Sequence, residues 1–226
     1  MSGNRLDHKE GLALFKSIDL LALGRMASHV AQKKNGNNAY FVRNMHINPT
    51  NICVNRCKFC AFSRSKGEPG AYEMSIEDIL NKARSAGKGV REFHIVSGLH
   101  PDLPFEWYLD MLRALKREFP KRHLKAFTAV EIDYLSKLSG LSLIDTLLQL
   151  KEAGLGSLPG GGAEIFNAAV RNTLCAEKIS GDRWLQVIEA AHGIGLKSNA
   201  TMLYGHIETY EHRVDHLIKL RELQDK

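Results

Sequence analysis

The sequence predicts an α/β protein built around a parallel sheet, and three observations support this fold class. Short apolar segments alternate with amphipathic helical segments from residue 45 to the end. The 226 residues are 44% hydrophobic and 25% charged, as in globular domains, and no apolar run reaches the ~18–20 residues that span a bilayer. A closed barrel needs eight strand–helix units in about 250 residues, and the pattern here has fewer. We therefore expect about five βα units that form an open sheet or an incomplete barrel.

Helices are expected before the first strand. Leu12, Phe15 and Ile18 recur at helical spacing, and Asp19 is a good N-cap for a second helix that ends at the polar turn of residues 33–38. We accordingly divide the chain into an N-terminal helical extension, residues 1–44, and a partial (β/α) barrel, residues 45–226.

The remaining elements follow in alternation. Strands are expected at residues 45–49, 93–96, 123–128, 155–158 and 197–203. Helices are expected at residues 76–83, 105–115, 135–138, 143–150 and 182–191, and from 214 to the end. Ser75 is the expected cap of the first of these helices, and Pro120 closes the second. Ligand-binding residues are expected where the carboxyl ends of the parallel strands meet.

Charge and histidine spacing exclude two classes of site. The net charge of +6 comes from scattered basic residues, whereas a nucleic-acid groove needs them clustered on one face. His212 and His216 have the spacing of a zinc peptidase helix, but Arg213 stands where such an enzyme carries its catalytic Glu. We expect these two histidines to lie on a solvated helix face.

The cysteines indicate metal chemistry in a reducing compartment, and hence a cytoplasmic protein. Cys53, Cys57 and Cys60 are separated by three and then two residues, so that one loop can bind three irons of a cubane cluster. Cys175 is far away in the sequence, which leaves one iron open, as in a catalytic metal site. A structural zinc site remains an alternative, with His46 or Cys175 as the fourth ligand.

This loop resembles the signature of the radical S-adenosylmethionine (radical SAM) superfamily. The match consists of Cys-x3-Cys-x2-Cys, with Phe59 just before the last Cys, at the end of the first strand. The resemblance implies a TIM-barrel-like fold and a [4Fe-4S] cluster whose unique iron binds the amine and carboxylate of S-adenosylmethionine (SAM). It further implies reductive cleavage of SAM to methionine and a 5′-deoxyadenosyl radical.

The same resemblance implies cofactor contacts at other strand ends. Ser97 and Gly98 occupy the turn that holds the methionyl amine, although the Gly-Gly-Glu-like pattern of the superfamily is otherwise missing. Glu164 follows a glycine run and is expected at a helix start, where it accepts hydrogen bonds from the ribose hydroxyls. Met202 belongs to the strand beside the adenine. With Phe59, these residues form the expected cofactor-binding set.

Several segments resemble the menaquinone (futalosine route) and deazaflavin branch of the superfamily. They are residues 46–51, 159–164, 200–202 and 205–208. Within the branch, residues 94–101 and 125–132 and Phe166 most resemble the aminodeoxyfutalosine synthase family. This implies a transferase of menaquinone biosynthesis that adds the 5′-deoxyadenosyl radical to 3-[(1-carboxyvinyl)oxy]benzoate and yields 6-amino-6-deoxyfutalosine. An electron donor such as flavodoxin or ferredoxin is implied, and His100 and Thr128 are expected on the substrate side.

Other readings stay open. Within the branch they are a dehypoxanthine futalosine cyclase and a deazaflavin synthase subunit, and outside it a zinc-stabilised binding module. With five strands, the last strand is expected to present an unpaired edge. We therefore expect a fragment or truncated product with a recognisable cofactor half and an incomplete substrate half.

Overall fold

A computed structural model describes residues 4–226 and contains a five-stranded parallel sheet with the strands in sequence order. The strands are β1 (Asn44–Ile47), β2 (Glu92–Ile95), β3 (His123–Ala126), β4 (Ser157–Leu158) and β5 (Lys197–Ser198). Each strand pairs with the next one along the chain, as successive βαβ units require. The predicted α/β class, with a partial barrel, is confirmed.

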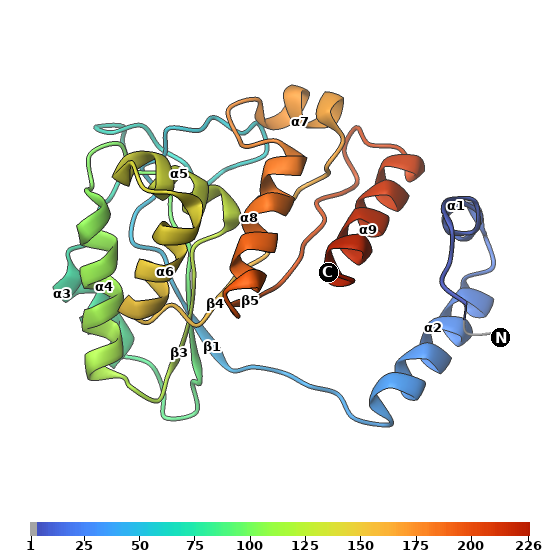
Figure 1. The fold of residues 1–226 in the computed structure, drawn as a ribbon, viewed down its shortest axis with the longest axis horizontal. Coiled ribbons are helices and arrows are strands. Elements are labelled where there is room, and N and C mark those ends of the chain that lie inside the picture. Colours follow the sequence, from blue (N-terminus) through green and yellow to red (C-terminus); the bar gives the residue numbers. More distant parts are fainter. Residues whose placement is uncertain (1–3) are drawn as a thin grey trace.

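Most helices follow a strand along the chain, and the first two precede the sheet and lie apart from it (Figure 1). They are α1 (His8–Lys16), α2 (Leu20–Asn35), α3 (Ile76–Arg84), α4 (Phe105–Glu118), α5 (Ala129–Ser139), α6 (Leu143–Ala153), α7 (Ala168–Cys175), α8 (Gly181–Gly193) and α9 (Tyr210–Gln224). Asp19 and Ser75 cap α2 and α3 as predicted, because their side chains accept from Ala22 N and Asp78 N.

The hydrophobic core lies between one face of the sheet and the helices that follow the strands. Phe93 and Ile95 of β2 and Leu124 of β3 are fully buried and pack in one cluster with residues of α3, α4, α5, α6 and α8. Because successive strand side chains point to opposite faces, the intervening residues, such as His94 and Lys125, face the other side of the sheet.

The N-terminal helices lie apart from the sheet. Helix α1 packs against α9, and the Arg221 side chain donates to the Leu6 carbonyl at 2.6 Å. Helix α2 buries no residue and is joined to β1 by an extended segment, as Figure 1 shows. The predicted domain boundary at residue 44 stays a prediction.

Some elements differ from the sequence prediction. The third strand ends at Ala126 instead of residue 128, because Phe127 has a positive φ of 59° and Thr128 caps α5. The fifth strand pairs over only two residues. Helix α7 was not predicted, because its short apolar pattern follows directly on a glycine-rich loop.

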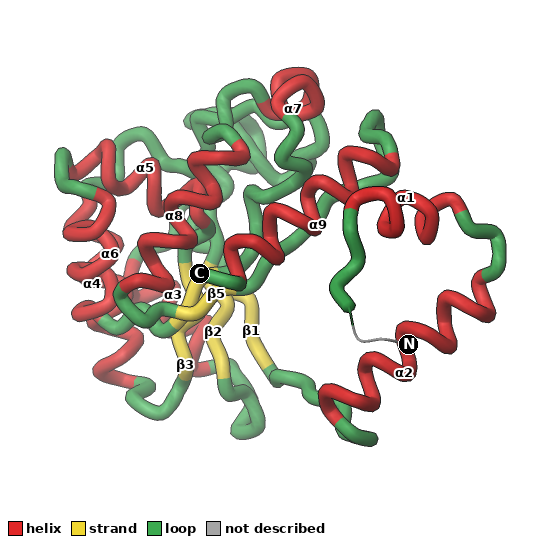
Figure 2. Tube along the Cα trace, turned by 45° about the vertical axis from the view of Figure 1, so that its right-hand side comes forward, coloured by secondary structure: helices red, strands yellow, loops and turns green. Residues whose placement is uncertain are grey.

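The partial barrel brings the loops after all five strands to one end of the sheet (Figure 2). Those loops include the cysteine loop after β1 and the glycine-rich loop after β4. No helix among residues 4–226 is long and apolar enough to cross a membrane.

Candidate functional site

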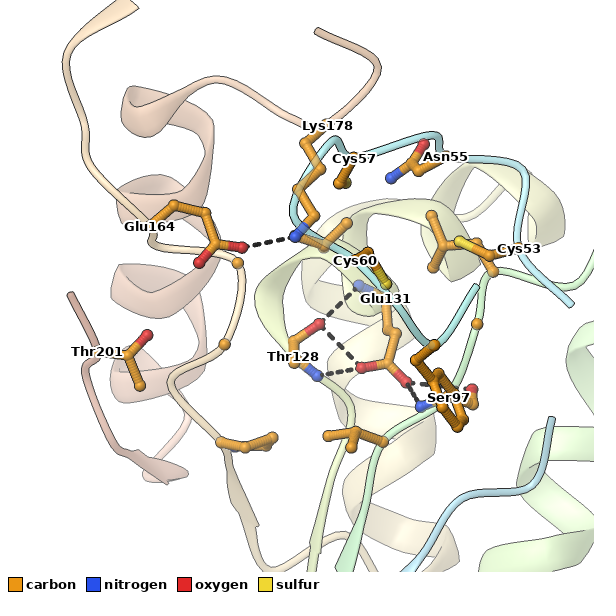
Figure 3. Close-up of a pocket in the computed structure, with 18 of the residues that line it drawn as sticks. Cys53, Asn55, Cys57, Cys60, Ser97, Thr128, Glu131, Glu164, Lys178 and Thr201 are labelled. Atoms are coloured by element: carbon orange, nitrogen blue, oxygen red, sulfur yellow. Dashed lines mark hydrogen bonds and ion pairs between the residues drawn. The ribbon is translucent and has the colours of Figure 1, made fainter. Parts of the chain in front are cut away.

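A pocket of about 680 Å³ opens at the carboxyl ends of the strands. This volume lies in the range of sites for small molecules and cofactors. Its walls come from the cysteine loop and from the ends of β2, β3, β4 and β5 (Figure 3). The predicted site residues that line it are Cys53, Cys57, Phe59, Cys60, Ser97, Gly98, Thr128 and Glu164.

Backbone hydrogen bonds hold the cysteine loop against neighbouring segments. Val54 N donates to Leu99 O at 3.0 Å, which joins the loop to the turn after β2. Lys58 N donates to Leu174 O at 2.8 Å, which joins it to α7. These two hydrogen bonds hold the loop between Cys53 and Cys60 from two sides. Its three cysteines form no disulfide.

The three thiols have different surroundings. Cys53 is half-buried, Cys57 is buried and Cys60 is exposed. Burial raises the pKa of Cys57 to about 11, although the Lys178 ammonium opposes the shift. Burial also raises the pKa of Cys60, but hydrogen bonds from Ser63 and Phe62 outweigh it, and the net shift is downward.

Gly98 allows the turn after β2 to touch the backbone that leads into Cys53. A Cβ at this position would lie 2.1 Å from Ile52 O, which no side-chain rotation can relieve. Gly98 N also donates to Thr50 O at 2.9 Å. Glycine is needed here because two backbone segments meet.

Glu131 brings a carboxylate to this turn, where residues 97–99 have none. Its Oε1 accepts from Ser97 N at 2.9 Å and from Ser97 Oγ at 3.2 Å. Its Oε2 accepts from Thr128 N at 2.7 Å and from Thr128 Oγ1 at 2.8 Å. Glu131 was not among the site residues predicted from the sequence. Its place three residues after Thr128 signals a capping box, but not the contact with Ser97.

Glu164 lies in the glycine-rich loop after β4, with a positive φ of 45°. The expectation that it begins a helix is wrong, because α7 starts at Ala168 after its cap, Asn167. Lys178 Nζ donates to Glu164 Oε1 at 2.6 Å and lies 5.1 Å from the centre of the Phe59 ring. Lys178 also lines the pocket, and no sequence signal pointed to it.

Arg171 stabilises the glycine-rich loop through hydrogen bonds to its carbonyls. Its buried guanidinium donates to the carbonyls of Gly162, Ala163 and Ile165, at 3.2, 2.7 and 3.4 Å. It also donates twice to Ile179 O. Because a guanidinium presents several donors in a fixed plane, this one side chain sets the shape of the loop.

The loop after β5 closes the pocket on the side opposite the cysteine loop. Thr201 Oγ1 donates to Gly160 O at 2.6 Å, and the Thr201 carbonyl accepts from His216 Nε2 at 2.9 Å. His216 is fully buried, so its expected place on a solvated face is wrong. Met202 is half-buried and does not line the pocket, whereas Thr201 does.

His100 also lies outside the pocket. Its ring is 1% exposed, and Nε2 lies 2.8 Å from Glu73 Oε2. Nδ1 accepts from Asp102 N and Leu103 N, and the His100 carbonyl accepts from Tyr134 Oη at 2.9 Å. In this structure His100 therefore fixes the loop after β2.

Comparison with known families gives one match that covers most of the chain. The model of the radical SAM superfamily matches residues 47–220. This chain belongs to the radical SAM superfamily. The match confirms the family predicted from the cysteine spacing.

Curated relatives include members of the branch that was predicted. The chain is 45% identical to aminodeoxyfutalosine synthase of Thermus thermophilus and 47% identical to that of Streptomyces coelicolor. The alignments cover 100% of this chain but 61% and 58% of those proteins. It is also 39% identical to 5-amino-6-(D-ribitylamino)uracil–L-tyrosine 4-hydroxyphenyl transferase of Methanopyrus kandleri, over 99% of this chain and 59% of that protein. The chain thus spans about three fifths of these relatives.

Solved structures confirm the fold of the radical SAM chain. Methylornithine synthase PylB superposes with a TM-score of 0.76 at 18% identity, covering 98% of this chain and 62% of that one. The hydrogenase maturase HydG from Carboxydothermus hydrogenoformans gives a TM-score of 0.75 at 20% identity, covering 99% and 51%.

The donor set fits the cluster of a radical SAM protein better than a single zinc ion. Across the described residues, no three His, Cys, Asp or Glu side chains lie close enough together to hold one metal ion. A zinc site draws its ligands to one point at about 2.3 Å from sulfur. A cubane takes each thiolate on a different iron, so three thiols spaced around one pocket suit it.

Proposed function

We propose that this chain carries the cofactor-binding residues of an aminodeoxyfutalosine synthase. The reaction adds the 5′-deoxyadenosyl radical of SAM to 3-[(1-carboxyvinyl)oxy]benzoate and, with loss of a carboxyl group, gives 6-amino-6-deoxyfutalosine. The observation that carries the proposal is the identity of 45–47% with two such synthases along the whole chain. The pocket with three free thiols supports it.

We assign the cluster to Cys53, Cys57 and Cys60. When bound and reduced, a [4Fe-4S] cluster supplies the electron that cleaves the sulfur–C5′ bond of SAM. The chain supports this by holding the cysteine loop rigidly through Leu99 and Leu174. The Lys178 ammonium lies over the Phe59 ring, 5.1 Å from its centre, and both residues line the pocket.

We assign the nucleoside to the glycine-rich side of the pocket. Glu164 offers a carboxylate to the ribose hydroxyls, and Gly160 and Gly161 line the pocket on the same side. We assign the wall beside the adenine to Asn199, Ala200 and Thr201, which line the pocket after β5. Apolar lining residues, Val96, Leu99 and Val130, exclude water and so protect a reactive carbon radical.

A basic row below the pocket suits an anionic substrate. His46, His94 and Lys125 lie in register on β1, β2 and β3, on the face opposite the core. The two imidazoles stack at 4.5 Å, and His94 also lines the pocket. Lys125 Nζ lies 3.2 Å from Glu92 Oε1, so His94 is the member of the row that can offer a hydrogen-bond donor to a carboxylate of the proposed substrate.

The likeness to the 4-hydroxyphenyl transferase supports a second candidate, in which a fragment of tyrosine is transferred to a ribitylaminouracil. Substrate choice separates the two. The chain is reconstituted with iron and sulfide without oxygen and then given SAM, dithionite and either substrate pair. An adenosylated product from the enolpyruvyl benzoate supports the synthase. Free 5′-deoxyadenosine with a tyrosine-derived adduct would favour the transferase.

We further propose that the electron comes from a small redox protein such as flavodoxin or ferredoxin, and that the protein works in the reducing cytoplasm. Four free cysteines, two of them buried, support a reducing compartment.

A further inference from the structure

Glu131 is a buried carboxylate in the wall of the pocket. It lies in the first turn of α5 and is 5% exposed. Figure 3 shows it between Ser97 at the end of β2 and Thr128 at the end of β3, below Cys60. Each of its oxygens accepts one backbone N–H and one hydroxyl.

These partners favour the ionised carboxylate but do not neutralise it. A backbone N–H can only donate, so Ser97 N and Thr128 N each require an accepting oxygen. Within residues 4–226, no Lys, Arg or His pairs with Glu131, whereas the other carboxylate in the pocket, Glu164, is paired with Lys178. Burial raises the pKa of Glu131, which reflects the cost of a charge without a cation.

Capping alone explains only half of this arrangement. The Oε2 bonds to Thr128 form the capping box of α5. The Oε1 bonds reach Ser97 on another strand, 34 residues away in the sequence. Of the four bonds, that from Ser97 Oγ is the longest, at 3.2 Å, so it is the one most easily exchanged for another donor.

We propose that Glu131 is the anionic group that binds the ammonium of the methionyl part of SAM. This inference rests on the proposed function and goes beyond it by naming the residue that recognises the amino-acid end of the cofactor. SAM carries two cationic groups, a sulfonium and an ammonium. Only the ammonium has N–H donors, and Glu131 offers hydrogen-bond acceptors. The exchangeable site on Oε1 takes one of those donors.

The test compares two ligands that differ in the amino-acid end. S-adenosylhomocysteine carries the ammonium and the carboxylate and lacks the sulfonium, and 5′-methylthioadenosine lacks all three groups. Calorimetry on the anaerobically reconstituted chain measures both affinities for wild type and for Glu131→Gln. We expect the variant to lose roughly 10- to 100-fold in affinity for S-adenosylhomocysteine, the value of a charged hydrogen bond, and less than about twofold for methylthioadenosine.

Asp133→Asn is the matched control. Asp133 is a buried carboxylate on the same helix, but its partners are Lys137 and Arg183 and it does not line the pocket. We expect it to leave the ratio of the two affinities unchanged. Equal losses for both ligands in Glu131→Gln, or no loss for either, would overturn the inference. If the wild-type chain holds no iron and binds neither ligand, the proposed function is refuted and the inference fails with it.

A second measurement does not depend on the folding of Glu131→Gln. In wild type, the ratio of the two affinities should fall as acid protonates Glu131. A ratio that is constant with pH contradicts a charge-based role.

Discussion

Gly98→Ala tests whether the turn after β2 positions the cysteine loop. The new Cβ would lie 2.1 Å from Ile52 O, 2.7 Å from Ile52 C and 3.1 Å from Asn51 C. Because a comfortable carbon–oxygen contact is more than about 3 Å, the two backbone segments must separate by roughly 1 Å. Overpacking of this kind costs about 1–3 kcal/mol, and the upper part of that range applies because no side chain can rotate away.

The displaced segment leads directly into Cys53, so the variant should also bind less iron. We expect a lower urea midpoint and, after anaerobic reconstitution, less than about half of the iron per chain found in wild type. Gly87→Ala is the control, because a Cβ there meets nothing within 4 Å. Wild-type iron content and urea midpoint in Gly98→Ala would refute the role given to this turn.

Three further predictions follow from buried or strongly bonded groups. Arg171→Met should lower the free energy of unfolding by about 3–5 kcal/mol, because it leaves several buried loop carbonyls without donors. Arg113→Met is the control, since Arg113 is exposed, and it should not shift the urea midpoint. Burial raises the pKa of Glu208, but hydrogen bonds from two backbone N–H groups and from Arg213 outweigh it and lower the pKa to about 2. The contribution of Glu208 to stability is therefore complete above about pH 4.5 and should be lost as pH falls toward 2. Glu208→Gln should flatten that part of the urea-midpoint profile. Cys175→Ala should keep the wild-type iron content, because Cys175 does not line the pocket, whereas Cys57→Ala should lose most of the iron. Equal iron contents in the two variants would contradict the assigned ligands.

Local signals in the sequence were sufficient for the fold and for the cysteine loop. The helix caps at Asp19 and Ser75 and the five strand positions follow from spacing and hydrogen-bonding chemistry within a few residues. Ends of elements were less predictable. Phe127, an apolar residue that reads as strand, takes a positive φ because Thr128 already caps the next helix.

The support of the site depends on contacts between distant segments, which local patterns do not contain. Glu131 reaches Ser97 and Lys178 reaches Glu164 only after the loops of neighbouring strands have come together. His216 seemed solvent-exposed because its neighbours on α9 are charged, yet it packs on Phe166 and bonds to the Thr201 carbonyl in the loop after β5.

The most direct test of the account is a count of iron and sulfide in the chain reconstituted without oxygen, with electron paramagnetic resonance of the reduced sample before and after SAM is added. Three cysteine ligands and one open iron predict about four irons and four sulfides per chain and a spectrum that SAM changes. Stoichiometric zinc in place of iron, or a reduced spectrum that SAM leaves unchanged, would contradict it.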